Sequence, residues 1–425
     1  MNWRPSRRRY NLMKIALLTL GTRGDVQPYA VLGKVLKGRG HDVILSTGRN
    51  FRSLAEAYGV NFIPVEADFH ALINSPEGKA MMKNPFLARK HFRTTVQPMM
   101  VDAMTTFYSV AADVDCVLYH AKSLGDFFAD QFPEKMIRAN VVPALTPTSE
   151  FPSPVFSGLS LPGFLNRFTY KLADLGLAMM NPAIRKFRIA SGLGVALPQL
   201  TNCKELYGIS ESFLKRPADF PDNIFFTGFW HGQSSENLDE EIIRFISPER
   251  KTIAVTFGSM PFQANFDLQK GLLEISRMLD VKILVVKGWG FENVGVSENK
   301  SMKVIEHAPF DKLFPQVAAV VHHGGIGTLS ECLRGGVPSL SCPVIYPMGD
   351  QHFWGDHAYK RGYAVKPVPL KKLKLDRLIK SISEMLTNRR IRENCQTLSS
   401  KLASENGPEN VAAIIESHFV LKSKN

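Results

Sequence analysis

Residues 318–344 read AAVVHHGGIGTLSECLRGGVPSLSCPV, and this stretch decides the fold class. A short apolar run ends in glycines, an amphipathic segment (328–334) follows, a glycine pair closes it, and a second apolar run (338–344) begins. This order is typical of a strand, a turn, a helix and a second parallel strand. The stretch therefore predicts an α/β unit whose glycine turn lies at the carboxyl end of the first strand.

The same order of segments opens each half of the chain. Near the N-terminus, KIALLTL (14–20) is followed by the turn GTRGDVQP (21–28), an amphipathic segment (29–40) and HDVILST (41–47). Pro28 is compatible with the first turn of a helix there. The second half opens with KTIAVTFGSM (251–260), which again ends in a glycine turn, and YAVKPV (363–368) is the last strand expected there. We therefore expect two doubly wound α/β domains.

The length and one polar stretch divide the chain. A length of 425 residues predicts two or three domains. The segment HGQSSENLDE (231–240) has the composition of a linker. We expect an N-terminal domain at 14–230, a C-terminal domain at 241–395, and a helical tail at 396–425 that packs back on the N-terminal domain. Ligands of doubly wound sheets bind outside the carboxyl ends of the strands, which favours a site in a cleft between the two domains.

The charge predicts an anionic partner without identifying it. The chain has 52 Lys and Arg against 39 Asp and Glu, a net charge of +13, and its pI is about 9.4. Nucleotides, nucleic acids and membrane surfaces all fit this charge. No recognised nucleic-acid motif and no basic stretch interleaved with aromatic residues is present, so we expect no nucleic-acid partner. Peripheral contact with an anionic membrane remains compatible with the charge.

The five cysteines and the apolar runs indicate a compartment. The count is odd and no C-x-x-C occurs, which favours reduced thiols in a cytoplasmic protein. No apolar run approaches the ~18 residues that a membrane-spanning helix needs. The first thirteen residues hold four arginines and no acid, which fits either a leader or a true start at Met13 instead of Met1. We expect a cytoplasmic protein, at most peripheral at a membrane.

Residues 150–200 differ from the rest of the chain because Phe, Leu, Met and Pro are dense there. The pattern is too irregular for a sheet core. It predicts helices or loops around an apolar cavity, or plain helical packing.

The segment His322–Thr328 carries the strongest chemical signal. Glycines let the backbone approach a ligand, and a helix start supplies free N–H donors that suit a phosphate. A histidine beside the glycines can donate a hydrogen bond. Thr328 can cap the helix and also offer its hydroxyl, and the carboxylate of Glu331 can accept from ribose hydroxyls. A Walker loop and the G-x-G-x-x-G fingerprint are absent from this stretch, and a tight turn without a ligand is the alternative.

A metal site is the competing interpretation of the adjacent histidines. Further candidate ligands follow downstream at Asp350, His352 and His357. Adjacent side chains usually diverge, and the chain has no H-x-x-x-H or Cys/His set. We therefore expect no metal.

Two further polar pairs follow predicted strands. Asp350 and Gln351 can exchange hydrogen bonds with sugar hydroxyls, or Asp350 can be an ordinary helix N-cap. Gly258 and Ser259 form a second possible phosphate contact after the strand that begins at residue 252.

The N-terminal half offers two candidate bases. Asp25 follows Gly24 where the first strand gives way to its helix, and it can cap the helix or take a proton from an acceptor hydroxyl. An aspartate is a weak base unless burial or a like charge raises its pKa. His120 also stands at a strand end and can be the base or orient it. Chemistry alone does not choose between them.

Together these motifs resemble the UDP-glycosyltransferase superfamily, whose members have the GT-B fold of two Rossmann-like domains facing a central cleft. The resemblance runs from Lys14 over nearly the whole chain. It rests on GTRGDVQPYAVLGKVLKGRGHDV (21–43), HHGGIGTLSECLRGGVPSLSCPV (322–344) and GDQHFWG (349–355). The shorter TPTSEFPSP (146–154) is similar to the sterol and lipid glucosyltransferase branch.

The resemblance implies an acceptor-binding N-terminal domain and a C-terminal domain that binds a nucleotide sugar. The nucleotide sugar, UDP-glucose by this resemblance, is a substrate, and no cofactor is implied. His323, Gly325, Gly327 and Thr328 fall at the diphosphate, Glu331 at the ribose, Asp350 and Gln351 at the donor sugar, and Ser259 near the phosphates. Gly24 joins this donor set. His307 stands where many plant relatives carry a tryptophan under the uracil, which is a departure from the family pattern.

The resemblance also favours Asp25 as the base. It occupies the position of a catalytic histidine in plant relatives, and bacterial relatives with the G-[ST]-R-G-D form use the aspartate, with His120 here as helper. The implied reaction is an inverting, metal-independent transfer of a hexose to an apolar alcohol such as a sterol, another lipid or a polyphenol. The alternatives are a bacterial natural-product or rhamnolipid-type transferase that uses another UDP- or dTDP-sugar, and a binding module that has lost catalysis.

Overall fold

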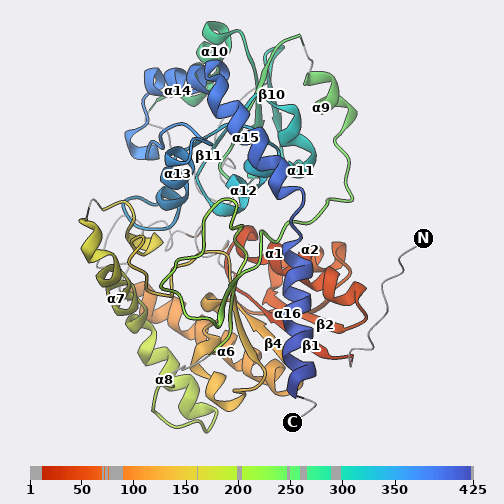
Figure 1. Ribbon diagram of the computed structural model, residues 1–425, viewed down its shortest axis with the longest axis vertical. Coiled ribbons are helices and arrows are strands. Elements are labelled where there is room, and N and C mark those ends of the chain that lie inside the picture. Colours follow the sequence, from red (N-terminus) through yellow and green to blue (C-terminus); the bar gives the residue numbers. More distant parts are fainter. Residues whose placement is uncertain are drawn as a thin grey trace.

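The computed structural model describes residues 12–68, 71, 75, 90–159, 161–198, 203–246, 249–258, 266–288 and 298–422. Figure 1 shows two bodies stacked along the long axis, the N-terminal half below and most of the C-terminal half above. Each body is built on a parallel sheet with helices around it. The predicted architecture of two Rossmann-like domains is therefore confirmed.

The N-terminal sheet has seven parallel strands in the order β3-β2-β1-β4-β5-β6-β7. The central strand β1 is almost wholly apolar and buried, and it pairs with a strand on each side, Ile15 lying opposite both Val43 and Cys116. Continuous apolar runs of this kind suit a parallel sheet covered on both faces. The strands are β1 (Lys14–Leu18), β2 (Asp42–Gly48), β3 (Asn61–Val65), β4 (Cys116–Tyr119), β5 (Met136–Asn140), β6 (Glu205–Tyr207) and β7 (Ile224–Phe226).

Helices cover this sheet. The helix after β1 buries Val26, Tyr29 and Leu32 along one stripe. It begins at Arg23, so Pro28 lies inside its second turn and not in the first turn, where it was expected. The α-helices are α1 (Arg23–Gly38), α2 (Arg52–Ala57), α6 (Gln97–Ala112), α7 (Asn166–Leu177) and α8 (Asn181–Ala190). Short turns that matter below are the 3₁₀ segments η3 (Ala121–Ser123), η6 (Pro154–Phe156), η7 (Gly163–Leu165) and η8 (Ala178–Met180).

The C-terminal sheet has five parallel strands in the order β10-β9-β8-β11-β12. They are β8 (Thr252–Thr256), β9 (Lys282–Val286), β10 (Met302–Ile305), β11 (Ala319–His322) and β12 (Ser339–Ser341). The helices are α9 (Glu240–Phe245), α10 (Leu268–Leu279), α11 (Phe310–Leu313), α12 (Ile326–Arg334), α13 (Gln351–Lys360), α14 (Leu375–Thr387), α15 (Arg389–Leu402) and α16 (Gly407–Lys422).

One predicted strand of this domain is incomplete. The segment 363–368 was expected to continue the sheet, but its only ladder position is a bridge between Ser339 and Ala364. Val365 and Val368 still donate backbone hydrogen bonds toward β12. Pro367 has no N–H to donate, so the ladder cannot continue through it.

The last helix returns to the N-terminal domain. Figure 1 shows α16 beside α1 and β2 in the lower body, whereas α15 lies in the upper one. Arg39, at the end of α1, donates from Nε and Nη2 to the two carboxylate oxygens of Glu416 at 2.7 and 2.5 Å. His41 Nε2 lies 3.2 Å from Glu416 Oε1. The Glu416 side chain is only 2% exposed, so this cluster joins α16 to α1 through buried charge.

Replacing Glu416 with alanine should destabilise the protein by about 2–4 kcal/mol, because it leaves His41 buried and Arg39 without its bidentate partner. Glu409→Ala is the matched control. Glu409 contacts the same Arg39 at 2.7 Å, but its side chain is 41% exposed, so its loss should cost about 0–1 kcal/mol. Chemical denaturation measures both, and equal losses would contradict the argument.

The described part of the segment 150–200 contains the helices α7 and α8, short 3₁₀ turns and loops. The inner face of α7 is lined by Asn166, Thr169 and Tyr170, while Phe168 and Leu175 are exposed. The helices thus present several apolar side chains outward instead of enclosing a cavity with them. Across the described residues, no helix combines the length and apolar character required to cross a membrane.

Candidate functional site

Two helix starts, one from each domain, meet at the junction between the domains. A Cβ built on Gly327, in the first turn of α12, would lie 3.9 Å from the Cα of Gly24, in the first turn of α1. The predicted phosphate loop of the C-terminal domain and the predicted base of the N-terminal domain therefore belong to one place in the molecule.

The loop after β11 is shaped around a histidine. Gly325 is the N-cap of α12, and a Cβ there would lie only 2.4 Å from His323 Nε2, so no larger residue fits without moving the ring. His323 Nδ1 is buried and has no hydrogen-bond partner in the part of the chain that the structure describes. Burial lowers the pKa of His323 to about 4, so the ring is neutral at neutral pH. A neutral imidazole can donate one hydrogen bond to a ligand.

The neighbouring His322 has a structural role. It is fully buried, and its Nδ1 accepts a hydrogen bond from the Gly324 backbone at 3.1 Å. Its Nε2 lies 3.4 Å from Ser341 Oγ on β12. Burial lowers its pKa to about 3. The two histidines thus diverge, and the described residues contain no group of His, Cys, Asp and Glu that is arranged to hold a metal.

The prediction that Thr328 caps α12 is wrong. The cap position is Gly325, and Thr328 is the third residue of the helix, where it is buried. The glycine leaves the first backbone N–H groups without a side-chain cap, which is the arrangement that suits an anionic ligand.

Glu331 lies one turn further along α12. Both of its carboxylate oxygens are 3.4 Å from Arg334 Nη1, and that guanidinium also donates to the carbonyl of Gly232 at 2.8 Å. Burial raises the pKa of Glu331 to about 7, although Arg334 opposes the shift. Near neutral pH the carboxyl group can therefore accept hydrogen bonds when ionised and donate one when protonated.

Asp350 and Gln351 begin α13. Asp350 is the N-cap residue, and its Oδ2 accepts a hydrogen bond from Trp354 Nε1 at 3.0 Å. Gln351 Oε1 accepts from the backbone N–H groups of Val344 and Ile345 at 2.8 and 3.1 Å, which fixes the amide in place. Burial raises the pKa of Asp350, while the charge of Lys122 from the other domain lowers it.

Asp25 is held by the turn that precedes α1. Thr22 is the N-cap, so Asp25 is not the cap residue but its capping-box partner three positions on: its Oδ2 accepts from the Thr22 backbone at 2.8 Å. Gly21 has a φ of +134°, and a Cβ there would lie 2.2 Å from Asp25 Oδ2. Glycine at position 21 of the GTRGD pattern therefore leaves the space that this carboxylate occupies.

Lys122 is the site residue that sequence reasoning missed. It lies in η3, and its Nζ donates to Asp25 Oδ1 at 2.7 Å. Its side chain is 57% exposed, whereas that of Asp25 is 11% exposed. The only signal in the sequence was a lysine two residues after the strand-end histidine, and nothing local indicated that it would reach across to the other loop.

Lys122 reverses the expected pKa shift of Asp25. Burial alone would raise the pKa of Asp25, but the charge of Lys122, the charge that His120 gains in acid, and the hydrogen bonds from Lys122 and Thr22 lower it overall. Asp25 therefore lacks the raised pKa that would make an aspartate a strong base. At neutral pH Asp25 is a paired carboxylate.

His120 lies at the end of β4 beside this pair. Its Nε2 is 4.0 Å from Asp25 Oδ1, and its Nδ1 accepts from the Lys122 backbone N–H at 3.1 Å. An accepting Nδ1 assigns the proton of the neutral ring to Nε2. Burial lowers the pKa of His120 to about 4, so the ring points a neutral N–H toward Asp25. This arrangement suits orientation of the carboxylate better than proton abstraction by the histidine.

Two predicted donor residues remain, His307 and Ser259. The His307 side chain is about half exposed, 48%, and its Nε2 lies 3.3 Å from Glu236 Oε2 in the linker. Partial burial and the charge of Arg23 lower the pKa of His307, while Glu236 opposes the shift. Ser259 lies outside the described residues. Its neighbour Gly258 is described, and a Cβ there would lie 3.3 Å from the His323 ring.

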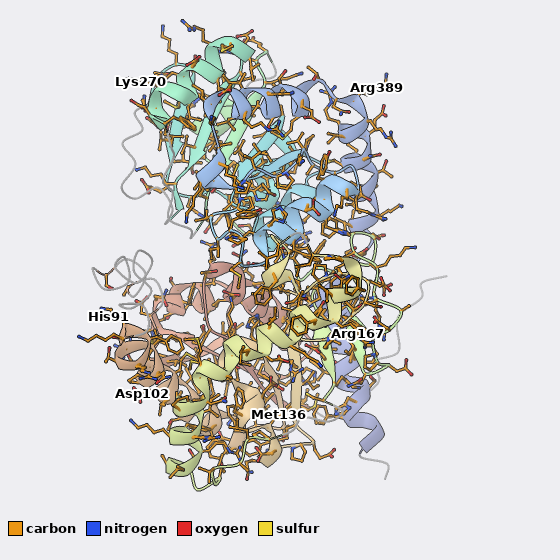
Figure 2. The ribbon with its side chains drawn as sticks, turned by 90° about the vertical axis from the view of Figure 1, so that its left-hand side faces the viewer. His91, Asp102, Met136, Arg167, Lys270 and Arg389 are labelled. Carbon is orange, nitrogen blue, oxygen red and sulfur yellow. The ribbon has the colours of Figure 1, made fainter. Side chains whose placement is uncertain are left out.

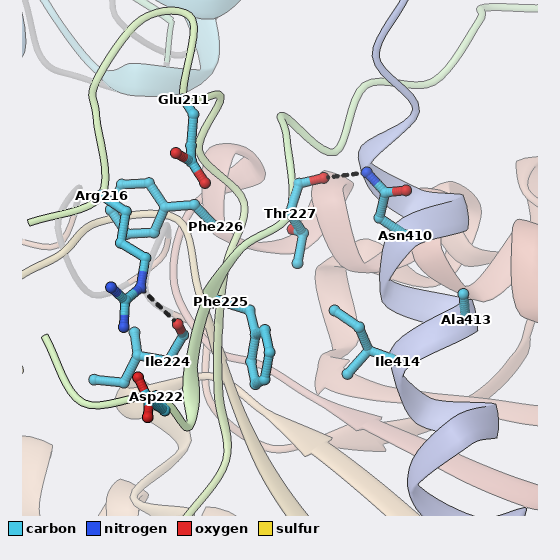
Figure 3. A pocket seen from close by; sticks show the side chains of 10 residues that line it. All are labelled: Glu211, Arg216, Asp222, Ile224, Phe225, Phe226, Thr227, Asn410, Ala413 and Ile414. Carbon is cyan, nitrogen blue, oxygen red and sulfur yellow. Dashed lines mark hydrogen bonds between the residues drawn. The ribbon is translucent and has the colours of Figure 1, made fainter.

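A separate hollow of about 490 Å³ lies between edge strand β7 and helix α16 (Figure 3). Arg216 Nε donates to the Ile224 carbonyl at 3.0 Å, and Asn410 Nδ2 donates to the Thr227 carbonyl at 2.9 Å. None of the predicted site residues lines it. The junction around Asp25 and His323 remains the candidate site.

Family comparisons match the two halves of the chain to two different domain types. Residues 15–125 match the glycosyltransferase family 28 N-terminal domain, and residues 278–417 match the erythromycin biosynthesis protein CIII-like C-terminal domain. Together with two parallel-sheet domains and a glycine loop at their junction, these matches show glycosyltransferase-type domains in both halves of a chain with the GT-B fold.

Relatives come from two branches. The chain is 28% identical to a sterol 3-beta-glucosyltransferase of Arabidopsis thaliana and to one of Yarrowia lipolytica, over 96% and 93% of its length. It spans only 65% and 28% of those proteins. It is 29% identical to O-mycaminosyltylonolide 6-deoxyallosyltransferase of Streptomyces fradiae, over 95% of this chain and 97% of that protein.

Solved structures show the same fold. The glycosyltransferase of kitacinnamycin matches with a TM-score of 0.69 at 16% identity, covering 96% of this chain and 99% of that one. The Streptomyces sp. SF2575 glycosyltransferase complexed with thymidine diphosphate matches with a TM-score of 0.61 at 16% identity, covering 95% and 99%.

Proposed function

We propose that this protein transfers a hexose, glucose in the first place, from a UDP-sugar to a hydroxyl group of an apolar acceptor such as a sterol, with inversion and without a metal. The single observation that carries the proposal is the close approach of Gly24, the residue before Asp25, to Gly327 in the first turn of α12 at the domain junction. The sterol 3-beta-glucosyltransferases among the relatives support the choice of acceptor.

Asp25 is the proposed base. Lys122 keeps it ionised, so it is ready to take a proton at neutral pH, and His120 and Thr22 fix its direction. Substrate binding that excludes water and draws Lys122 away would strengthen this base, because the pairing is what lowers its pKa. The acceptor oxygen then attacks the anomeric carbon from the face opposite the diphosphate, which inverts the configuration.

The glycine loop between β11 and α12 is the proposed binding site of the leaving diphosphate. The open start of α12 and the N–H of His323 would stabilise the charge that gathers on it as the sugar bond breaks. Gly325, Gly327 and Thr328 line this start, and Ser259 would add a hydroxyl. Glu331 would bind the ribose of the nucleotide. Asp350 and Gln351 would bind the sugar that is transferred, and His307 would lie at the uracil ring.

A macrolide-type transferase is the second candidate. It is favoured by the Streptomyces fradiae relative, which the chain matches over 97% of that protein's length, and by the neighbour complexed with thymidine diphosphate. The donor would then be a dTDP-sugar or another UDP-sugar.

One assay separates the two. Purified protein without added metal is mixed with UDP-glucose or a dTDP-sugar and with sterols, polyphenols or macrolides, and nucleotide release and product mass are measured. Product from UDP-glucose and a sterol supports the proposal. Turnover of another alcohol with no sterol product would overturn the sterol assignment, and turnover only from dTDP-sugars would overturn the donor.

Lys122→Met should move the acidic limb of the kcat/KM profile to higher pH. Lys122 lowers the pKa of Asp25, so the wild-type carboxylate stays ionised to lower pH, and the variant should lose activity several-fold near pH 5 but much less near pH 8. Lys122→Arg keeps the cation and is the control. An unchanged limb in Lys122→Met would remove this pair from the pH dependence.

A further inference from the structure

Exposed apolar side chains concentrate on one short segment. Among the described residues, fifteen large apolar side chains are exposed, and nine of them lie between residues 159 and 195. The most exposed of these nine are Phe164 at 84% and Leu175 at 70%. Scattered exposed apolar residues are ordinary, but a cluster on one surface marks an interaction site. The nine are Leu159, Leu161, Phe164, Phe168, Leu175, Leu177, Met179, Ile189 and Val195.

The cluster is organised along one helix. Phe164, Phe168 and Leu175 follow each other at spacings of four and seven residues, which places them on one stripe of the helix that comprises η7 and α7. The opposite face of α7 is buried through Asn166, Thr169 and Tyr170. The apolar stripe therefore points outward, away from the body of the domain. We call Phe164, Phe168 and Leu175 the outer stripe.

Positive charge accompanies the outer stripe. The segment 159–195 holds five basic residues and one acid, Asp174. Arg188 is buried and paired with Asp130, which leaves Arg167, Lys171, Arg185 and Lys186 exposed. Lys171 falls on the stripe itself, seven residues after Phe164. In Figure 2 the helix pair α7–α8 faces the viewer, with Arg167 labelled near the start of α7.

The segment just before the outer stripe in the chain contacts the domain junction. The Val155 carbonyl accepts from the Gly349 backbone at 2.7 Å, and the Gly158 carbonyl accepts from the Tyr346 hydroxyl at 3.2 Å. These contacts join η6 to the loop that ends at Asp350. Ile345 and Met348 of that loop are exposed as well. The apolar surface thus begins beside the candidate active site.

We propose that the outer stripe and its flanking basic residues dock the protein on an anionic lipid bilayer, which places the junction at the membrane surface where an apolar acceptor resides. This inference rests on the proposed function for the acceptor only. An amphipathic helix with aromatic and leucine side chains among Lys and Arg binds such interfaces through buried apolar area and charge.

Charge selects a bilayer over a second copy of this chain. A symmetric dimer through the outer stripe would place the four exposed cations against the same four cations of the partner. Like charges in an interface oppose association, whereas anionic headgroups complement them.

Vesicle co-sedimentation tests the proposal. We expect the protein to bind vesicles of phosphatidylcholine and phosphatidylglycerol at a three-to-one ratio, and to bind pure phosphatidylcholine more weakly. The variant F164S/F168S/L175S should lose about 100-fold in affinity, because three apolar side chains no longer insert. The variant K171E/K186E should lose affinity for the anionic vesicles only, and wild-type binding should weaken with salt. The variant I243S/M278S, which removes exposed apolar residues of the C-terminal domain, is the matched control.

Two results would overturn the docking surface. One is unchanged vesicle binding by F164S/F168S/L175S, and the other is a concentration-dependent dimer that this variant abolishes. Nucleotide release separates this failure from a failure of the proposed function. The triple variant should keep turnover of a water-soluble polyphenol and lose turnover of sterol in vesicles. Vesicle binding without any sugar transfer would leave the docking surface standing and overturn the proposed activity.

Discussion

Asp25→Asn should lower kcat by about 10²- to 10⁴-fold, the range expected for loss of a positioned general base. The substitution keeps the shape of the side chain. An amide oxygen can still accept the 2.8 Å hydrogen bond from the Thr22 backbone, so the start of α1 should survive. What is lost is the negative charge that takes the acceptor proton and that pairs with Lys122. Steady-state kinetics with nucleotide release measure the change.

Binding and folding controls make the Asp25 result interpretable. Nucleotide affinity by calorimetry should stay within about threefold of wild type, since the donor loop belongs to the other domain. Asp113→Asn, which removes an exposed partner of Lys14, is the matched control and should be fully active. Near-normal turnover by Asp25→Asn would take Asp25 out of the mechanism. A chain that binds donor but shows no turnover even as wild type would point to a binding module.

The fold could be predicted from the sequence because its signals are local. The first strand of each of the two central α/β units is an apolar run that leads into a glycine turn, and a parallel sheet buries such runs on both faces. The one strand that was expected and is incomplete, 363–368, contains Pro367, whose missing N–H is visible in the sequence. Strand patterns alone did not show how far the pairing would be interrupted.

The site could be predicted only where one loop supplies the geometry. The segment from His322 to Glu331 is a single strand–turn–helix, so its glycines and histidines have one arrangement. Asp25 depends instead on Lys122, which is 97 residues away and reaches it through parallel pairing of β1 and β4. The sign of the Asp25 pKa shift follows from that contact, and no spacing in the sequence reports it.

The position of Thr328 shows a second limit. Threonine is a good N-cap residue, and so a threonine at a glycine turn favours a cap. The helix instead begins two residues earlier, at Ile326, with Gly325 as its cap. The outward stripe of α7 could not be predicted for a different reason. Apolar spacing defines one face of a helix, but it does not say whether the protein covers that face.

His323→Ala should lower kcat/KM by about 10²- to 10³-fold, as expected when one donor to a developing negative charge is removed. His323 lies against the start of α12, and its Nδ1 is buried without a partner in the described residues, so a ligand is the group that can use the ring. Because its pKa is about 4, the ring donates as a neutral imidazole, and the loss should be of similar size at pH 6 and pH 9. His323→Gln keeps an N–H donor near the same place and should recover part of the activity. A loss confined to low pH would show that a cation is required, and no loss in His323→Ala would move the leaving diphosphate away from this loop.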